Sequence, residues 1–164
     1  APDELGRRLR PSLEAAGVWD EAYLAEKHAW FFAVLELLKP RAKRLEEFVS
    51  LRRFFFGDAV DYDEAAVTKH LRTSSMDGHL QAVDAAFAEL VTFDPVATEA
   101  ALRAVADARR VKAATLIHAV RVAITGRSIS PGLFEVAALL GREGSRARLA
   151  AAIRLISSDD REHE

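Results

Sequence analysis

The sequence predicts an all-α protein, a helical bundle or cage in two packed subdomains, on three observations. Apolar residues recur at helical spacing along most of the chain, and no alternating β-branched stretch typical of a strand is present. Prolines and glycines stand where helices should begin and end, as at Pro95 and Gly126. The chain has 164 residues, 50% of them hydrophobic, which is enough for one domain or two small ones.

The first half of the chain predicts a series of helices separated by polar or proline-containing turns. Asp20 can cap a helix that stops before Pro40, and Pro40 can start the next helix. The apolar stripes of these two helices are Leu24, Phe31, Leu35 and Leu38, then Leu45, Phe48 and Leu51. His28 falls on the first stripe, and we interpret it as a packed core histidine.

The next segments predict a helix end and two further helices. The triplet Phe54-Phe55-Phe56, followed by Gly57-Asp58, is typical of a helix end packed into a core. Asp61 or Asp63 should start a short helix, and residues 73–78 should form a polar turn. The helix after this turn carries Leu80, Val83, Phe87 and Leu90.

A stop and restart at residues 92–95 is the expected joint between the subdomains. Asp94 can be the N-cap and Pro95 the first helical residue. We therefore divide the chain into an N-terminal subdomain, residues 1–93, and a C-terminal subdomain, residues 94–164. In the latter, Gly126 should end a helix, Ser130-Pro131 should start another that closes at Gly141, and a last helix should run out at residues 157–158.

Composition and charge exclude several classes of protein. The absence of cysteine excludes disulfides and thiolate zinc sites. Charged residues interrupt every apolar stretch, so we expect no membrane span, and the N-terminus has no signal-like apolar core. The formal net charge is −2, whereas nucleic-acid binders usually carry a strong excess of basic residues. The local electrostatic potential nevertheless matters more for binding than the net charge does.

No catalytic or metal-binding constellation is recognisable. The histidines (His28, His70, His79, His118 and His163) follow no metal-ligand spacing. Gly141-Arg142-Glu143-Gly144 lacks the flanking strand and Lys-Ser of a phosphate loop. Ser74 and Ser75 have no nucleophile-elbow context. The sequence therefore predicts no active site and no metal site.

Two groups of basic residues are candidates for binding a polyanion. In the segment 38–45, Pro40 should place basic residues on the first turn of a helix, where they oppose the helix dipole unless an anion is near. Arg121 lies on a nearly apolar helix, where it could snorkel, pair with a carboxylate, or read a base with its planar guanidinium. A solvated face remains an alternative for the basic run.

Residues 118–136 closely resemble a pattern of bacterial-type glutamyl-tRNA synthetases. The stretch reads HAVRVAITGRSISPGLFEV, and the pattern is H-P-L-R-x-A-L-T-G-x-x-x-S/T-P-G-L-F-E. The resemblance continues through residues 138–143 and Arg148-Leu149. Upstream, residues 37–45 are similar to the family segment L-x-x-x-R-x-x-T-L, and residues 54–56 and 61–63 fit the positions that follow. The match spans nearly the whole chain in the right order.

The resemblance implies an α-helical domain that grips the anticodon arm of the tRNA for glutamate. It implies that Arg41 reads the third anticodon base, and that Arg121 converges with it on one cavity for flipped-out nucleotides. The loop residues implied to line the site with Arg121 are Ser130, Pro131, Leu133 and Phe134. Weaker contacts to phosphates are expected from Lys39, Lys43, Arg44, Arg53 and Arg127.

Departures from the family pattern limit what this chain should do. Ala119 replaces the usual proline, and Arg44 stands where threonine is common. The ATP-site signatures of the family are missing, so the chain alone should not activate glutamate and needs no cofactor; ATP and magnesium would belong to a parent enzyme's catalytic domain. We expect a monomer in the cytoplasm. The alternative is a free-standing relative that binds another RNA or a protein.

Overall fold

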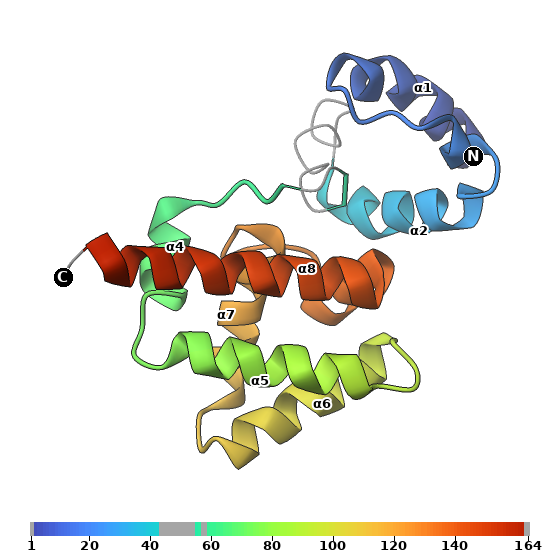
Figure 1. Ribbon diagram of the computed structural model, residues 1–164. Coiled ribbons are helices and arrows are strands. Elements are labelled where there is room, and N and C mark those ends of the chain that lie inside the picture. The colour runs from blue at the N-terminus through green and yellow to red at the C-terminus, as the bar shows by residue number, and fades with distance from the viewer. Residues whose placement is uncertain (1, 43–54, 57–58, 163–164) are drawn as a thin grey trace. The chain divides into compact units, whose positions relative to one another are not determined.

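The computed structural model describes residues 2–42, 55–56 and 59–162 (Figure 1). All regular elements in these ranges are helices, which confirms the predicted all-α class. The described chain forms two compact units, residues 1–59 and 60–164, and each unit is described here by itself.

The first unit is built from short helices around an aromatic cluster. Its elements are α1 (Pro2–Ala15), η1 (Glu21–Leu24), α2 (His28–Leu38) and η2 (Lys39–Arg41). The rings of Tyr23 and Phe31 stack with centroids 5.0 Å apart, and Phe56 meets Tyr23 edge to face at 5.5 Å. Phe31 is fully buried. Of the triplet Phe54-Phe55-Phe56 that was predicted to pack into the core, Phe55 and Phe56 are buried, whereas Phe54 lies outside the described residues.

Helix α1 is an element that the sequence analysis did not predict. Its apolar residues are sparse, and Pro11 lies inside it, where proline usually interrupts a helix. Leu9 and Leu13 are nevertheless buried, at 1% and 3% exposure, one helical turn apart. The helix is therefore stabilised by packing of this narrow stripe rather than by helix propensity.

Asp20 caps a shorter element than expected. Its carboxylate accepts a hydrogen bond from the Ala22 N–H, but the helix that follows is the single turn η1. Helix α2 begins only at His28, after a break in which Lys27 forms an ion pair with Asp20 at 2.6 Å. The interpretation of His28 as a core histidine is wrong: it is exposed at the helix start, with its ring 4.0 Å from that of Phe32.

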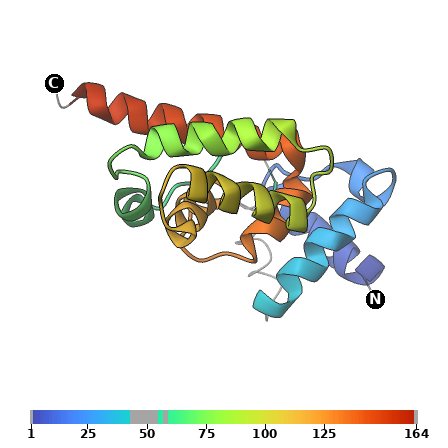
Figure 2. The same cartoon turned by 90° about the horizontal axis from the view of Figure 1, so that it is seen from below.

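The second unit contains the longer helices. They are α4 (Glu64–His70), α5 (Met76–Glu89), α6 (Pro95–Ala108), α7 (Ala113–Thr125) and α8 (Leu133–Glu162). Figure 2 shows α5 lying along α8, and α6 and α7 also pack against α8. Helix α7 supplies much of the core, with Leu116, Ala119, Val120, Val122, Ala123 and Ile124 all fully buried.

The predicted helix caps of this unit are largely confirmed. The carboxylates of Asp63 and Asp94 accept hydrogen bonds from the backbone N–H three residues later, and Pro95 is the first residue of α6. Gly126 ends α7 in the left-handed conformation, with φ 76°. These signals depend on local geometry, which explains why they could be read from the sequence.

Helix α8 differs from the expectation at both of its ends. It begins at Leu133, after Ser130-Pro131, and it runs to Glu162, beyond the expected stop at residues 157–158. The predicted break at Gly141 is confirmed, because this residue interrupts the helix with φ 79° and ψ 172°. That conformation is essentially restricted to glycine. The buried Ser145 hydroxyl donates to the Ala137 carbonyl across the break.

The two units divide at residues 59/60 and not at the expected joint at 93/94. Asp94 does separate two helices, but α5 and α6 pack against each other within the second unit. The rings of Phe87 and Phe93 meet at 5.4 Å across the turn, and Arg142 of α8 donates to the Leu90 carbonyl. A helix boundary in the sequence is therefore not a subdomain boundary here.

In the part of the chain that the structure describes, no helix is both long and apolar enough to cross a membrane.

Candidate nucleic-acid interface

Arg121 and Ser130 are joined by a hydrogen bond within the second unit. Arg121 is half-buried on α7, and its Nε donates a hydrogen bond to the Ser130 hydroxyl at 3.1 Å. That hydroxyl in turn donates to the Pro131 carbonyl at 2.7 Å. The orientation of the guanidinium is therefore fixed by the loop that follows α7, as a side chain that recognises a base must be.

The loop at residues 126–132 is fastened to the segment before α4. The Asp63 N–H donates to the Gly126 carbonyl at 2.8 Å. A side chain at residue 126 would lie 2.2 Å from the Asp61 carbonyl oxygen, so glycine is required there by space as well as by φ. The Thr125 hydroxyl donates to the Arg121 carbonyl at 2.7 Å and accepts from the Arg127 N–H at 3.2 Å.

The loop residues implied by the resemblance differ in exposure. Ser130 and Leu133 are buried, at 8% and 2% exposure, and Pro131 is buried as well. Phe134 is half-buried, and the neighbouring Ile129 is 79% exposed. The buried residues shape the loop, whereas Phe134 and Ile129 offer apolar surface against which a base can pack.

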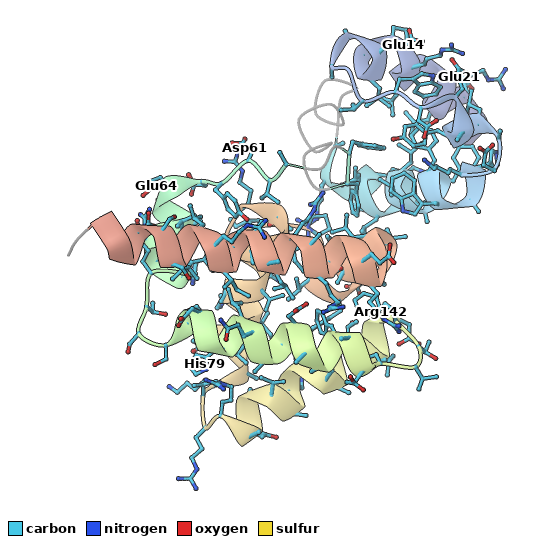
Figure 3. All side chains as sticks on the ribbon, viewed as in Figure 1. Glu14, Glu21, Asp61, Glu64, His79 and Arg142 are labelled. Atoms are coloured by element: carbon cyan, nitrogen blue, oxygen red, sulfur yellow. The ribbon has the colours of Figure 1, made fainter. Side chains whose placement is uncertain are left out.

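Arg127 is engaged with a carboxylate. Its Nη2 donates to Oδ2 of Asp61 at 2.6 Å, and the two side chains are 28% and 72% exposed (Figure 3). Asp61 is labelled on the segment that precedes α4. The expected phosphate contact from Arg127 must therefore compete with this ion pair.

Lys39 and Arg41 belong to the first unit. Both are exposed in the single turn η2, and the Lys39 ammonium lies 3.6 Å from the Glu36 carboxylate. They follow the C-terminus of α2, where cations are favoured by the helix dipole. The helix that Pro40 was predicted to start would lie mostly in residues 43–54, outside the described residues, so the argument from an unfavourable dipole stays a prediction. Lys43, Arg44 and Arg53 lie outside the described residues.

The convergence of Arg41 and Arg121 on one cavity stays a prediction. Arg41 lies in the first unit and Arg121 in the second, and each unit is described by itself.

Two histidines near Arg121 were not recognised as site residues in the sequence. The rings of His70, at the end of α4, and His118, on α7, stack with centroids 5.1 Å apart. Burial lowers the pKa of His70, and the neighbouring His118, Lys69 and Arg121 lower it further. His118 and Arg121 are separated by one helical turn, which was the available signal in the sequence.

A buried arginine supports the helix that carries Arg121. Arg148 of α8 is 5% exposed, and its Nη1 donates to the Ile124 carbonyl at 2.8 Å near the end of α7. Tyr62 donates to the Ala123 carbonyl in the same turn, and burial raises the pKa of its hydroxyl. Both bonds satisfy carbonyls at the α7 C-terminus, which holds the start of the loop in place.

In the described ranges no group of histidines and carboxylates could hold a metal ion. The second unit offers a guanidinium held by Ser130, together with apolar surface at Ile129 and Phe134. Guanidinium groups and aromatic faces are features that recognise unstacked bases of RNA loops.

Residues 4–153 match the family described as the anticodon binding domain. This chain is a member of that family. The anticodon-binding domain is also 32% identical to the glutamate–tRNA ligase of Desulfotalea psychrophila, in a match that covers 94% of this chain and 32% of that protein. The ligase of Moorella thermoacetica is 32% identical as well, with 94% and 31% covered. The chain thus spans about a third of the length of these relatives.

Solved structures agree on the fold of this anticodon-binding domain. A glutamate tRNA ligase from Elizabethkingia meningosepticum, crystallised with its amino acid, matches with a TM-score of 0.79 and 18% identity over 94% of this chain and 29% of that one. The glutamate-tRNA synthetase of Elizabethkingia anophelis matches with a TM-score of 0.74, also at 18% identity, over 93% and 28% of the two chains. The resemblance to the glutamyl-tRNA synthetase anticodon-binding domain is confirmed.

Proposed function

We propose that this domain recognises the anticodon arm of the tRNA for glutamate as part of a cytoplasmic glutamate–tRNA ligase. The catalytic work, with ATP and magnesium, would belong to a further domain of that enzyme. The observation that carries the proposal is the hydrogen bond from Arg121 to Ser130, which orients a partly exposed guanidinium within a chain of the anticodon-binding family.

The chemistry of the site supports a single-stranded RNA ligand. A guanidinium can donate two hydrogen bonds to one base edge and can stack on a base face. Ile129 on the loop and Phe134 in the first turn of α8 add apolar surface. Each contact of this kind contributes about 1–3 kcal/mol in other RNA and DNA complexes.

A titration of the purified chain with fluorescently labelled anticodon stem-loops tests the proposal. We expect saturable binding, tighter for the glutamate than for the glutamine stem-loop. Affinity should fall as salt concentration rises, because cations that contact phosphates displace counterions. An affinity that is flat across the salt series would argue against a nucleic-acid partner.

The same samples test the proposed monomeric state. Sedimentation should give the mass of a monomer for the chain alone. With one stem-loop it should give the mass of a complex that contains one chain and one RNA. If neither stem-loop binds while an unrelated RNA does, the result supports the alternative, a free-standing relative that no longer takes part in aminoacylation.

A further inference from the structure

The stacked pair of His70 and His118 is a surface feature that the base-reading roles above do not use. The ring centroids are 5.1 Å apart and the planes are inclined by 26°. His118 is exposed and His70 is half-buried, so both imidazole rings, one from α7 and one from α4, reach the surface. Two imidazoles in contact can present several N–H and N groups to one ligand.

The charged groups around this pair are cationic. Besides its partner His118, the groups that act on His70 are Arg121 on α7 and Lys69 on its own helix. Helix α7, which packs on α4, carries no carboxylate, and the carboxylates of Glu64 on α4 and Asp159 on α8 form ion pairs with Arg72. The local potential therefore favours an anion and disfavours protonation while the anion is absent.

The pair is adjacent to the base-reading arginine. His118 precedes Arg121 by one helical turn, so their side chains lie on the same side of α7. The charge on Arg121 also contributes to lowering the pKa of His70. The imidazoles are therefore within reach of the backbone of an RNA loop held at Arg121.

We propose that His70 and His118 together bind a backbone phosphate of the RNA loop that Arg121 contacts, and that a proton is taken up when it binds. The inference rests on the proposed function. The proton comes from solvent and converts one imidazole to imidazolium, whose N–H groups donate to the phosphate oxygens; no bond of the RNA is broken. The phosphate supplies the negative charge that the pair lacks, which makes the protonated form favourable.

Histidine NMR on the full chain measures the effect directly. The Cε1–H resonances of His70 and His118 are followed against pH with and without the glutamate stem-loop. We expect the pKa of at least one of the two to rise by about one pH unit or more on binding, as expected for an imidazole that gains an anionic partner. The pKa values of both should stay unchanged if the pair is only structural.

Affinity measured against pH is the second test. Binding of the wild-type chain should tighten as pH falls from 8 to 6, by up to roughly tenfold per pH unit for one proton. His70→Gln and His118→Gln should bind more weakly at pH 6 and lose most of this dependence. His79→Asn, on α5, is the matched control and should retain it. Far-UV circular dichroism verifies that each variant is folded.

The outcomes separate this inference from the function on which it depends. If the wild-type chain binds no stem-loop at any pH, both fail. If it binds with unchanged histidine pKa values, or if the glutamine variants keep the wild-type pH dependence, only the inference is overturned. Inorganic phosphate at millimolar concentration serves as a second ligand. An equal rise of the pKa with phosphate alone would overturn the assignment to RNA.

Discussion

The guanidinium of Arg127 donates to the carboxylate of Asp61 at 2.6 Å and joins the loop after α7 to the segment before α4. The ion pair is partly exposed, so its contribution to stability is below about 1 kcal/mol. We expect its larger effect to be on RNA binding, because it neutralises a cation in the loop that also carries Ser130.

Asp61→Asn should strengthen stem-loop binding, by about twofold to fivefold, a range usual for one phosphate contact of modest strength. The amide removes the negative charge while it keeps the size of the side chain, so Arg127 becomes available to a phosphate. Fluorescence anisotropy at several salt concentrations measures both the affinity and its salt dependence. Unchanged affinity would mean that Arg127 has no phosphate contact; Arg127→Gln on its own is the control.

Arg121→Ala should weaken binding of the glutamate stem-loop by roughly fivefold to 150-fold, the equivalent of about 1–3 kcal/mol. The residues on either side of Arg121, Val120 and Val122, are fully buried, so thermal unfolding must be recorded beside the affinity. Arg121→Lys keeps the charge but loses the planar fork, and it should recover little of the loss. A variant that unfolds while its folded fraction binds normally would make Arg121 a structural residue.

Arg41→Gln should narrow the preference for the glutamate over the glutamine stem-loop. Arg41 is exposed in η2, so the substitution should leave stability within about 0.5 kcal/mol of wild type. Parallel titrations with the two stem-loops measure the ratio of affinities. Equal selectivity in variant and wild type would mean that Arg41 does not recognise an anticodon base.

Gly126→Ala should destabilise the second unit by more than about 2 kcal/mol. The methyl group would meet the Asp61 carbonyl oxygen at 2.2 Å, in addition to the strain of a left-handed residue. Gly17 has a similar φ of 71°, but a methyl group there would have no atom within 4 Å, so Gly17→Ala is the matched control. The Gly17→Ala substitution should lower the free energy of unfolding by only about 1 kcal/mol.

Urea unfolding followed by far-UV circular dichroism separates these two effects. Both tryptophans, Trp19 and Trp30, belong to the first unit, so their fluorescence reports on Gly17→Ala. Equal losses of stability in the two glycine variants would contradict the close approach at Gly126.

The free energy of unfolding should fall as the pH is lowered from 7 toward 5.5. Burial and the nearby Arg109, whose Nε donates to His79 Nδ1 at 2.6 Å, lower the pKa of His79 in the folded chain. Below about pH 6.5 the unfolded chain binds a proton that the folded chain does not, and this favours unfolding. Urea midpoints across this range measure the loss.

His79→Asn isolates this contribution, because the amide oxygen can still accept from Arg109 but does not titrate. The variant should show a shallower loss of stability on acidification than the wild-type chain. His70 contributes in the same direction, since its pKa is also lowered by burial. An identical pH profile in the variant would contradict the assignment of this effect to His79.

Local signals in the sequence predicted much of the helical framework. Asp63, Asp94-Pro95, Gly126 and the break at Gly141 are confirmed because caps and left-handed residues depend on a few neighbouring atoms. Helix α1 was missed because its stability depends on partners distant in sequence. Its Gly6 lies where a side chain would come within 3.0 Å of Phe31.

By itself the sequence determined the all-α class and the membership of the anticodon-binding family, and it made Arg121 the leading candidate for base recognition. The tertiary structure alone decided that Ser130 orients Arg121, that Asp61 neutralises Arg127 and that His70 meets His118. Helical periodicity and family motifs are properties of consecutive residues. The partner of a side chain on another element depends on how helices pack, and no spacing along one helix encodes it.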